Sequence, residues 1–203
     1  MALAPVIRLF SFRPTRPSFD SVLRNEAIPS LRGLPDLQAM YVGRQGPDEL
    51  GPRLVASVWP SLESMDNAMG GAVDWAGFHP ERLQDVVEEA VEVLSLAVSF
   101  KSAGAESARI LRTLRGRILP GKRAAYIEEA RAGVEADGEA GHGPLAYYLA
   151  TGESEDTFVT LSAWSSWTAI EMATGGDIRR PLATRHPELI AAWEATHYEA
   201  LEP

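Results

Sequence analysis

The sequence repeats itself, and this repeat limits the folds open to the chain more than any other feature. A Ser-x-Trp-x-Ser pattern occurs twice, 105 residues apart, at Ser57, Trp59 and Ser61 and at Ser162, Trp164 and Ser166. A glycine pair follows each copy, ending at Gly71 and Gly176, and His-Pro-Glu recurs from His79 and His186. Similar features in the same order predict two related halves in one chain.

A short segment separates the two copies. Residues 101–107, Lys-Ser-Ala-Gly-Ala-Glu-Ser, are mostly small and polar, which is typical of a linker. We therefore predict two repeats, residues 1–103 and residues 104–203, each of the size of a small domain.

Each half begins with the same pair of patterns. Alternating apolar residues predict a first strand at Val6–Phe12 and at Ala108–Ile118. Helix-breaking residues then precede an amphipathic stretch, at Pro14–Ser18 in the first half and at Pro120–Lys122 in the second. These breakers predict where the first helix of each half begins.

Two more strands, a second helix and a last strand follow in each half. The second and third strands are expected at Leu37–Val42, Leu54–Trp59, Leu145–Ala150 and Thr157–Trp164. Ser61 and Ser166 are suited to cap a second helix that stops at the glycine pair. The last strand is expected near Val91–Phe100 and near Thr196–Leu201.

The resulting order, βαββαβ in each half, predicts an α+β protein built from two ferredoxin-like repeats. A four-stranded antiparallel sheet with both helices on one face leaves its other face bare. Two repeats in one chain can cover each other's bare face, so we expect a single-chain dimeric α+β barrel, in effect a pseudo-dimer. Exposed strand edges would still allow further oligomerisation.

Composition excludes several other classes. A net charge of −9 argues against nucleic acid as a partner, and the absence of cysteine excludes disulfides and thiolate chemistry. Four scattered histidines give no metal-binding pattern, so we expect no metal site. No apolar stretch approaches the ~20 residues of a membrane helix, and the first residues lack a secretory signal pattern, so we expect no membrane partner and a cytoplasmic protein.

Short motifs in the second half carry a family resemblance. They are Arg115–Lys122 (RGRILPGK), Leu161–Ser166 (LSAWSS), His186-Pro187-Glu188 and His197-Tyr198-Glu199. With these motifs the chain resembles the antibiotic biosynthesis monooxygenase family of the dimeric α+β barrel superfamily. The resemblance is weaker in the first half, where Arg13–Pro17 lacks the Pro-Gly-Lys sequence.

The resemblance implies oxygenation of a small aromatic compound, a phenol, quinol or polyketide, without metal, flavin or haem. In such chemistry the substrate itself supplies electrons to dioxygen, so the site needs a base, aromatic walls and groups that hold the developing charge. Trp59 and Trp164 occupy the position where pocket-lining tryptophans occur in these monooxygenases. The expected ligand is a small aromatic molecule, and no cofactor is expected.

Eight residues are candidates for the site. We predict catalytic roles for Trp164, Tyr148 and His186, and substrate-binding roles for Trp59, Tyr41, His79, Trp167 and Ser162. Each type also has a structural interpretation: a tryptophan at a strand end often fills the core, a strand tyrosine often packs, and a residue before Pro-Glu often begins a helix.

Two other functions are alternatives to the monooxygenase hypothesis. A second branch of the superfamily binds and degrades haem, with a histidine on or after the second helix as the usual iron ligand, and His79 and His186 lie in that region. The resemblance to this branch is incomplete, because Ala68 and Ala173 replace its second tryptophan. Alternatively, the duplicated chain only binds a small molecule, with one half reduced to a scaffold.

Overall fold

The computed structural model describes residues 4–71, 77, 79–152, 156–182 and 187–201. The chain divides into two compact units. The first unit contains Met1–Ser95 and Tyr198–Glu202, and the second contains Leu96–His197 and Pro203. The division falls between Ser95 and Leu96, within the strand Val86–Lys101. The repeat boundary predicted at residue 103 stays a prediction from the sequence.

The first unit contains a sheet of antiparallel strands in the order β2-β3-β1-β4. These strands are β1 (Val6–Pro14), β2 (Ala39–Arg44), β3 (Arg53–Trp59) and β4 (Val86–Lys101). Every residue of β3 is buried, whereas β4 is largely exposed along its first half. The last residues of the chain's final strand pair with β2, at Gly43 and Arg44.

The helices of the first unit are short. They are α1 (Phe19–Val22), α2 (Ile28–Arg32) and α3 (Leu62–Met69), with a wider helical turn at Leu23–Ala27. The amphipathic stretch predicted after Pro17 therefore forms a helix in three pieces, with Pro29 inside its last piece. Proline has no backbone N–H to donate, which favours such an interruption. The cap prediction for α3 is confirmed, because Ser61 accepts a hydrogen bond from the backbone of Ser64.

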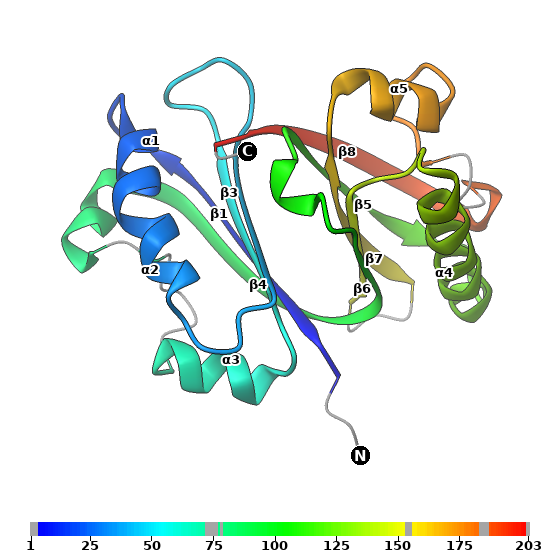
Figure 1. Cartoon of the computed structure of the whole chain (residues 1–203), viewed down its shortest axis with the longest axis horizontal. Coiled ribbons are helices and arrows are strands. Elements are labelled where there is room, and N and C mark those ends of the chain that lie inside the picture. The colour runs from blue at the N-terminus through cyan, green and yellow to red at the C-terminus, as the bar shows by residue number, and fades with distance from the viewer. Residues whose placement is uncertain (1–3, 72–76, 78, 153–155, 183–186, 202–203) are drawn as a thin grey trace. The chain divides into compact units, whose positions relative to one another are not determined.

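The second unit has the same order of elements, and its first helix is one long, uninterrupted helix (Figure 1). Its strands and helices are β5 (Ile110–Ile118), α4 (Arg123–Ala140), β6 (Ala146–Thr151), β7 (Thr157–Trp164), α5 (Trp167–Thr174) and β8 (Ile190–Ala200). The Ser166 side chain caps α5 by accepting from the backbone of Ala169, as predicted. No helix in the described part of the chain is both long and apolar enough to cross a membrane.

The hydrogen-bonded strand order joins all eight strands. It runs β1-β3-β2-β8-β5-β7-β6-β4 and returns to β1, which is the order of a closed barrel. Strands β4 and β8 enter both sheets: β4 pairs with β1 as far as Ser95 and with β6 from Leu96 onward. The predicted α+β class and closed antiparallel barrel are confirmed, and the tandem duplication stays a prediction.

Both last strands begin earlier than expected. Strand β4 starts at Val86 and β8 at Ile190, each directly after a short helical turn that begins at a proline, Pro80 or Pro187. The early parts of these strands are rich in alanine and glutamate, which favour helices. Pairing of β4 with β1 overrides that local preference.

One face of the second unit's sheet packs against its helices. The cluster on this face includes Ile110, Leu114, Leu149, Phe158 and Trp164 from the strands. Tyr126, Ala130 and Val134 of α4 and Ile170 of α5 complete it. Because side chains alternate along a strand, Arg112 and Ser162 share this helix-facing side.

Candidate functional site

The two predicted tryptophans occupy matching positions in the two units. Trp59 and Trp164 are fully buried, and each donates its indole N–H to a serine hydroxyl two residues earlier in its own strand, at 2.9 Å. The acceptors are Ser57 and Ser162. Each tryptophan packs in the core of its own unit, so both satisfy their polar atom inside the protein.

The predicted tyrosines lie on the other face of each sheet. Tyr148 pairs with Leu161, and Tyr41 pairs with Ala56, so both alternate with the positions that face the helices. The structure therefore does not bring Tyr148 and Trp164 to one side of the sheet. The tyrosine that does share the helix-facing side is the neighbouring residue, Tyr147, which pairs with Ser162.

The His-Pro-Glu motifs start short helical turns. His79 is exposed, and its carbonyl accepts a hydrogen bond from the Arg82 backbone at 2.8 Å. Its backbone also helps to lower the pKa of Glu26, after the larger effect of the hydrogen bond from Arg82. His186 lies outside the described residues.

A buried arginine stands at the centre of the helix-facing side of the second unit. Arg112, on β5 opposite Ser162, is 1% exposed. Its Nε donates to the Ile178 carbonyl at 3.2 Å, and its Nη2 donates to the Arg180 carbonyl. Backbone carbonyls are neutral dipoles, so they stabilise the buried charge without cancelling it, and the surroundings of Arg112 stay electropositive.

Burial lowers the pKa of Arg112 to about 10, and the nearby groups Tyr147, Tyr126 and Asp177 act in the opposite direction. The guanidinium thus remains charged at pH 7. Tyr147 comes from β6 and Tyr126 from α4, so phenol groups from both the sheet and the helix layer act on this charge.

His197 adds a neutral imidazole to this arginine. Burial, followed by the charge of Arg112, lowers the pKa of His197 to about 4; a backbone hydrogen bond to Ile178 opposes this shift and the charge of Arg179 adds to it. Its Nε2 is buried and has no hydrogen-bond partner among the described residues. The ring is therefore neutral at pH 7, Nδ1 is left to donate to Ile178, and Nε2 keeps an unused lone pair.

An aromatic side chain covers part of the imidazole. The rings of Trp167 and His197 lie 5.4 Å apart between centroids, tilted by 49°. Trp167 is the first residue of α5 and is 38% exposed. The predicted site residue Trp167 thus contacts His197, which was not among the predicted site residues.

Residues Asp177–Arg180, called here the 177–180 loop, hold these groups in place. Trp193 of β8 donates its indole N–H to the Arg179 carbonyl at 3.2 Å, while Arg112 engages the carbonyls on either side. The Asp177 carboxylate accepts from the Arg179 backbone at 3.0 Å, which fixes the turn. The backbone carbonyls of the loop therefore accept hydrogen bonds from strand side chains, and the side chain of Arg179 stays exposed.

We name Arg112, Tyr147, Trp167 and His197 the arginine-histidine cluster. It combines a buried cation, a neutral hydrogen-bond acceptor, a phenol and a partly exposed indole, all within the second unit. Such a set can accept a proton from a weak acid and stabilise the anion that remains.

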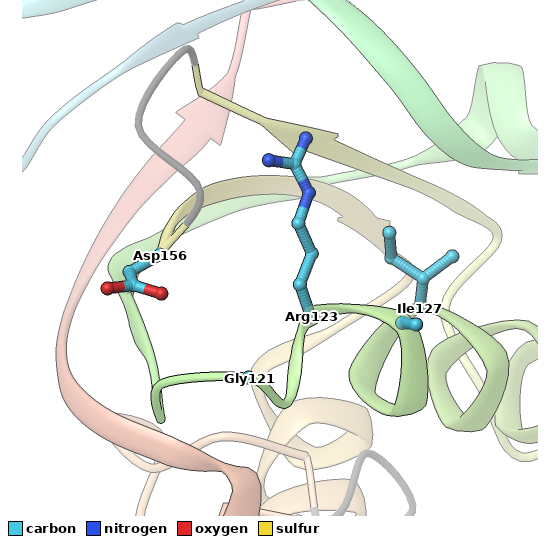
Figure 2. Close-up of a pocket in the computed structure, with 5 residues that line it drawn as sticks. Gly121, Arg123, Ile127 and Asp156 are labelled. Carbon is cyan, nitrogen blue, oxygen red and sulfur yellow. The ribbon is translucent and has the colours of Figure 1, made fainter.

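A separate pocket of about 330 Å³ lies at the start of α4 (Figure 2). Arg123 and Ile127, one helical turn apart, line it together with Asp156 and Gly121. Arg123 also donates to the hydroxyl of Thr151 at the end of β6. This pocket lies by the start of β7, whereas Ser162 and Trp164 lie near its end, and none of the predicted site residues lines it.

The described residues leave the predicted haem ligands, His79 and His186, untested. His79 is exposed, and the pocket at the start of α4 contains no histidine. No group of three or more acidic or histidine ligands for a metal ion occurs among the described residues. Haem binding stays a prediction that a titration can test.

The sequence motifs did not select the main members of the cluster. Arg112 is one arginine among many in a strand pattern, and its burial is not visible in the chain. His197 was part of a motif, but its role depends on Arg112 and the 177–180 loop, which are distant in sequence. Only the register of β6 distinguishes Tyr147 from Tyr148.

Comparison with solved structures identifies the fold. A putative monooxygenase from Fusobacterium nucleatum matches with a TM-score of 0.78 at 10% identity, over 100% of this chain and 94% of that one. A putative monooxygenase from Lactobacillus acidophilus matches with a TM-score of 0.77 at 8% identity, over 98% and 94%. The chain has the fold of these monooxygenase-like proteins.

An anthrone oxidase-like protein is more distant in structure, with a TM-score of 0.59 at 13% identity, over 97% of this chain and 91% of that one. No family model matches the sequence, and no curated protein matches it. The resemblance expected from the sequence motifs is thus confirmed as a shared fold. The shared fold does not define the activity, because one fold hosts many activities and the activity depends on the residues of the site.

Proposed function

We propose that the second unit oxygenates a small phenolic or quinol-like aromatic compound with dioxygen and without a cofactor. The carrying observation is the buried Nε2 of His197, a lone pair without a hydrogen-bond partner among the described residues, close to the buried charge of Arg112. The shared fold with monooxygenase-like proteins supports the proposal.

The first step is removal of a proton. An aromatic hydroxyl that reaches Nε2 donates its proton there, and the phenolate that forms interacts with Arg112. A protonated His197 is unfavourable in the free protein, first because the ring is buried and then because of the charge of Arg112, and both lower its pKa. The phenolate compensates this cost, since an opposite charge nearby favours the charged imidazole.

The second step is oxidation by dioxygen, for which anthrone is a suitable test compound, because its enol tautomer, anthrol, carries the aromatic hydroxyl that the first step requires. Loss of a proton gives an electron-rich anion, and the anion transfers electrons to dioxygen. In the overall reaction the methylene carbon becomes a carbonyl, one oxygen atom enters that carbonyl and the other leaves as water. All four electrons come from the substrate, so no further reductant is required.

The remaining candidate residues have supporting roles in this proposal. Trp167 offers a flat surface to the aromatic ring, and Tyr147 donates a hydrogen bond or lines the site. Ser162 and Trp164 maintain the strand that carries the cluster, through their mutual hydrogen bond. The first unit, which we propose to be a duplicate of the second, serves as a scaffold.

Oxygen consumption with anthrone tests the proposal. Wild-type protein should consume dioxygen and form anthraquinone that contains one atom from isotopically labelled dioxygen. His197→Val should lower the rate by about 100-fold, a typical contribution of a general base. His142→Ala is the matched control, because His142 is an exposed loop residue of the same unit, and it should keep the wild-type rate.

Two results would overturn the proposal. One is an unchanged rate in His197→Val with the fold intact by circular dichroism. The other is a saturable hemin titration, with a shifted Soret band at one equivalent and activity only after hemin is added. That second result would favour the haem branch, and loss of the shift in His79→Ala or His186→Ala would identify the ligand.

A further inference from the structure

We propose that the arginine-histidine cluster selects an aromatic ligand that already carries an anionic oxygen, and that Arg179 is the residue that sets this preference. The inference rests on the proposed function, because it concerns the same site. It adds the charge of the ligand and a residue outside the reacting groups.

The first observation is the exposure of two indole rings at this site. Trp167 is 38% exposed and Trp193 is 41% exposed. Trp167 contacts the His197 ring, and Trp193 is held by the Arg179 carbonyl. Large aromatic side chains that stay exposed next to buried polar groups are typical of binding surfaces.

The second observation is the arrangement of charge. Arg112 and Arg179 are both close enough to His197 for their charges to act on its imidazole. Within the described part of the chain, Asp177 is the acidic group that acts on the charge of Arg112, and its carboxylate already accepts from the backbone of Arg179. The cluster therefore holds a local excess of positive charge in a chain whose net charge is −9.

The third observation is the rigidity of the 177–180 loop. The carbonyls of Ile178, Arg179 and Arg180 each accept a hydrogen bond from a strand side chain. This leaves the Arg179 side chain as an exposed group on a fixed backbone, so that it can meet a ligand without ordering a flexible segment.

These observations favour an anionic over a neutral ligand. A neutral phenol would leave Arg112 and Arg179 without an opposing charge, whereas a phenolate or carboxylate oxygen forms charge-assisted hydrogen bonds with guanidinium groups. The indole rings of Trp167 and Trp193 accept the flat part of the same molecule. The chemical class is thus a hydroxylated aromatic acid, whose carboxylate meets the guanidinium groups and whose neutral hydroxyl is left to donate its proton to His197.

Binding of naphthoate and of its neutral isostere naphthamide tests the inference, measured by calorimetry on the full chain at pH 7. Wild type should bind naphthoate at least about tenfold more tightly, as expected for a charge-assisted contact in a partly buried site. Arg179→Ala should reduce this preference to less than about twofold while naphthamide affinity is unchanged. Arg117→Ala removes the same charge from an exposed position on β5 and should keep the wild-type preference.

Three outcomes would overturn the inference: equal affinity for the two probes, a preference that survives in Arg179→Ala, or no detectable binding of either probe. Each is distinct from failure of the proposed function. If naphthoate binds with the predicted preference but anthrone gives no oxygen consumption, the anion site stands and the oxygenase proposal fails. If anthrone is oxidised and the probes bind equally, the oxygenase proposal stands and the role of Arg179 is wrong.

Discussion

The two units share a buried framework but differ in the residues placed around it. Arg8 and Arg112 are both buried on the first strand of their unit, each opposite a serine that accepts from a tryptophan. Next to the serine, the first unit has Met40 where the second has Tyr147. The first residue of the following helix is Leu62 in the first unit and Trp167 in the second.

The strand on the other side of the arginine differs in the same way. On β4, Val93 pairs with Arg8 and lies 85 residues after it in the sequence. On β8, His197 lies 85 residues after Arg112, so His197 is the counterpart of Val93. The elements common to both units are therefore an arginine, a serine and a tryptophan. Those that differ exchange apolar residues for a phenol, an imidazole and an indole. In the proposed function the shared serine and tryptophan support the fold, and the shared Arg112 acts in the reaction only because the second unit places these differing residues around it.

The largest expected effect concerns the shared set. Trp59→Ala and Trp164→Ala should each destabilise the protein by about 3–5 kcal/mol, because each removes a buried indole and leaves a cavity. Urea unfolding of the two variants measures the free energies of unfolding. A much smaller loss for Trp164→Ala than for Trp59→Ala would contradict the comparison and favour the predicted catalytic role of Trp164.

The second effect separates the two arginines. Arg112→Met should lower the rate of oxygen consumption by about 100-fold, since removal of a preorganised charge costs about that much in other enzymes. Arg8→Met should keep the rate per folded molecule, with both variants checked by thermal unfolding. Equal loss of activity in both variants would mean that the first unit also takes part in the reaction.

The third effect is on stability as a function of pH. Because the pKa of His197 is about 4 in the folded protein and near 6.5 in an unfolded chain, the unfolded state binds more protons between these values. Stability should therefore fall as the pH decreases from about 6.5 to about 4. His197→Val should show a shallower slope than wild type in this window by urea unfolding. A histidine resonance that titrates near 6.5 and disappears in His197→Val would contradict this interpretation.

The smallest effect concerns the indole at the start of α5. Trp167→Leu installs the residue of the first unit and should weaken binding of naphthamide by about threefold to tenfold, the range expected for an aromatic contact. Calorimetry on the variant gives this ratio. An unchanged affinity would place the aromatic ring of the ligand elsewhere.

Much of the fold was predictable from the sequence because the repeat aligns one half with the other. The caps at Ser61 and Ser166 and the strands that end in Trp59 and Trp164 follow from local patterns. The early parts of β4 and β8 did not follow, because their composition favours helix and their pairing with other strands decides their state.

The site was less predictable for a related reason. Repetition drew attention to Trp164, yet a repeated residue is also what a shared framework requires. His197 and Arg112 become meaningful only when β8, β5 and the 177–180 loop meet, which is tertiary information. Tyr147 and Tyr148 are adjacent in β6, so their side chains lie on opposite faces of the sheet. The sequence alone does not show which of the two faces the helices.

The central claim is that the residues by which the second unit differs from the first carry the activity. The most direct measurement is oxygen consumption with anthrone by the triple variant Tyr147→Met, Trp167→Leu and His197→Val, which gives the second unit the apolar residues of the first and retains Arg112. The account predicts a folded protein with a rate at the level of the uncatalysed reaction. A folded triple variant that keeps the wild-type rate would contradict it.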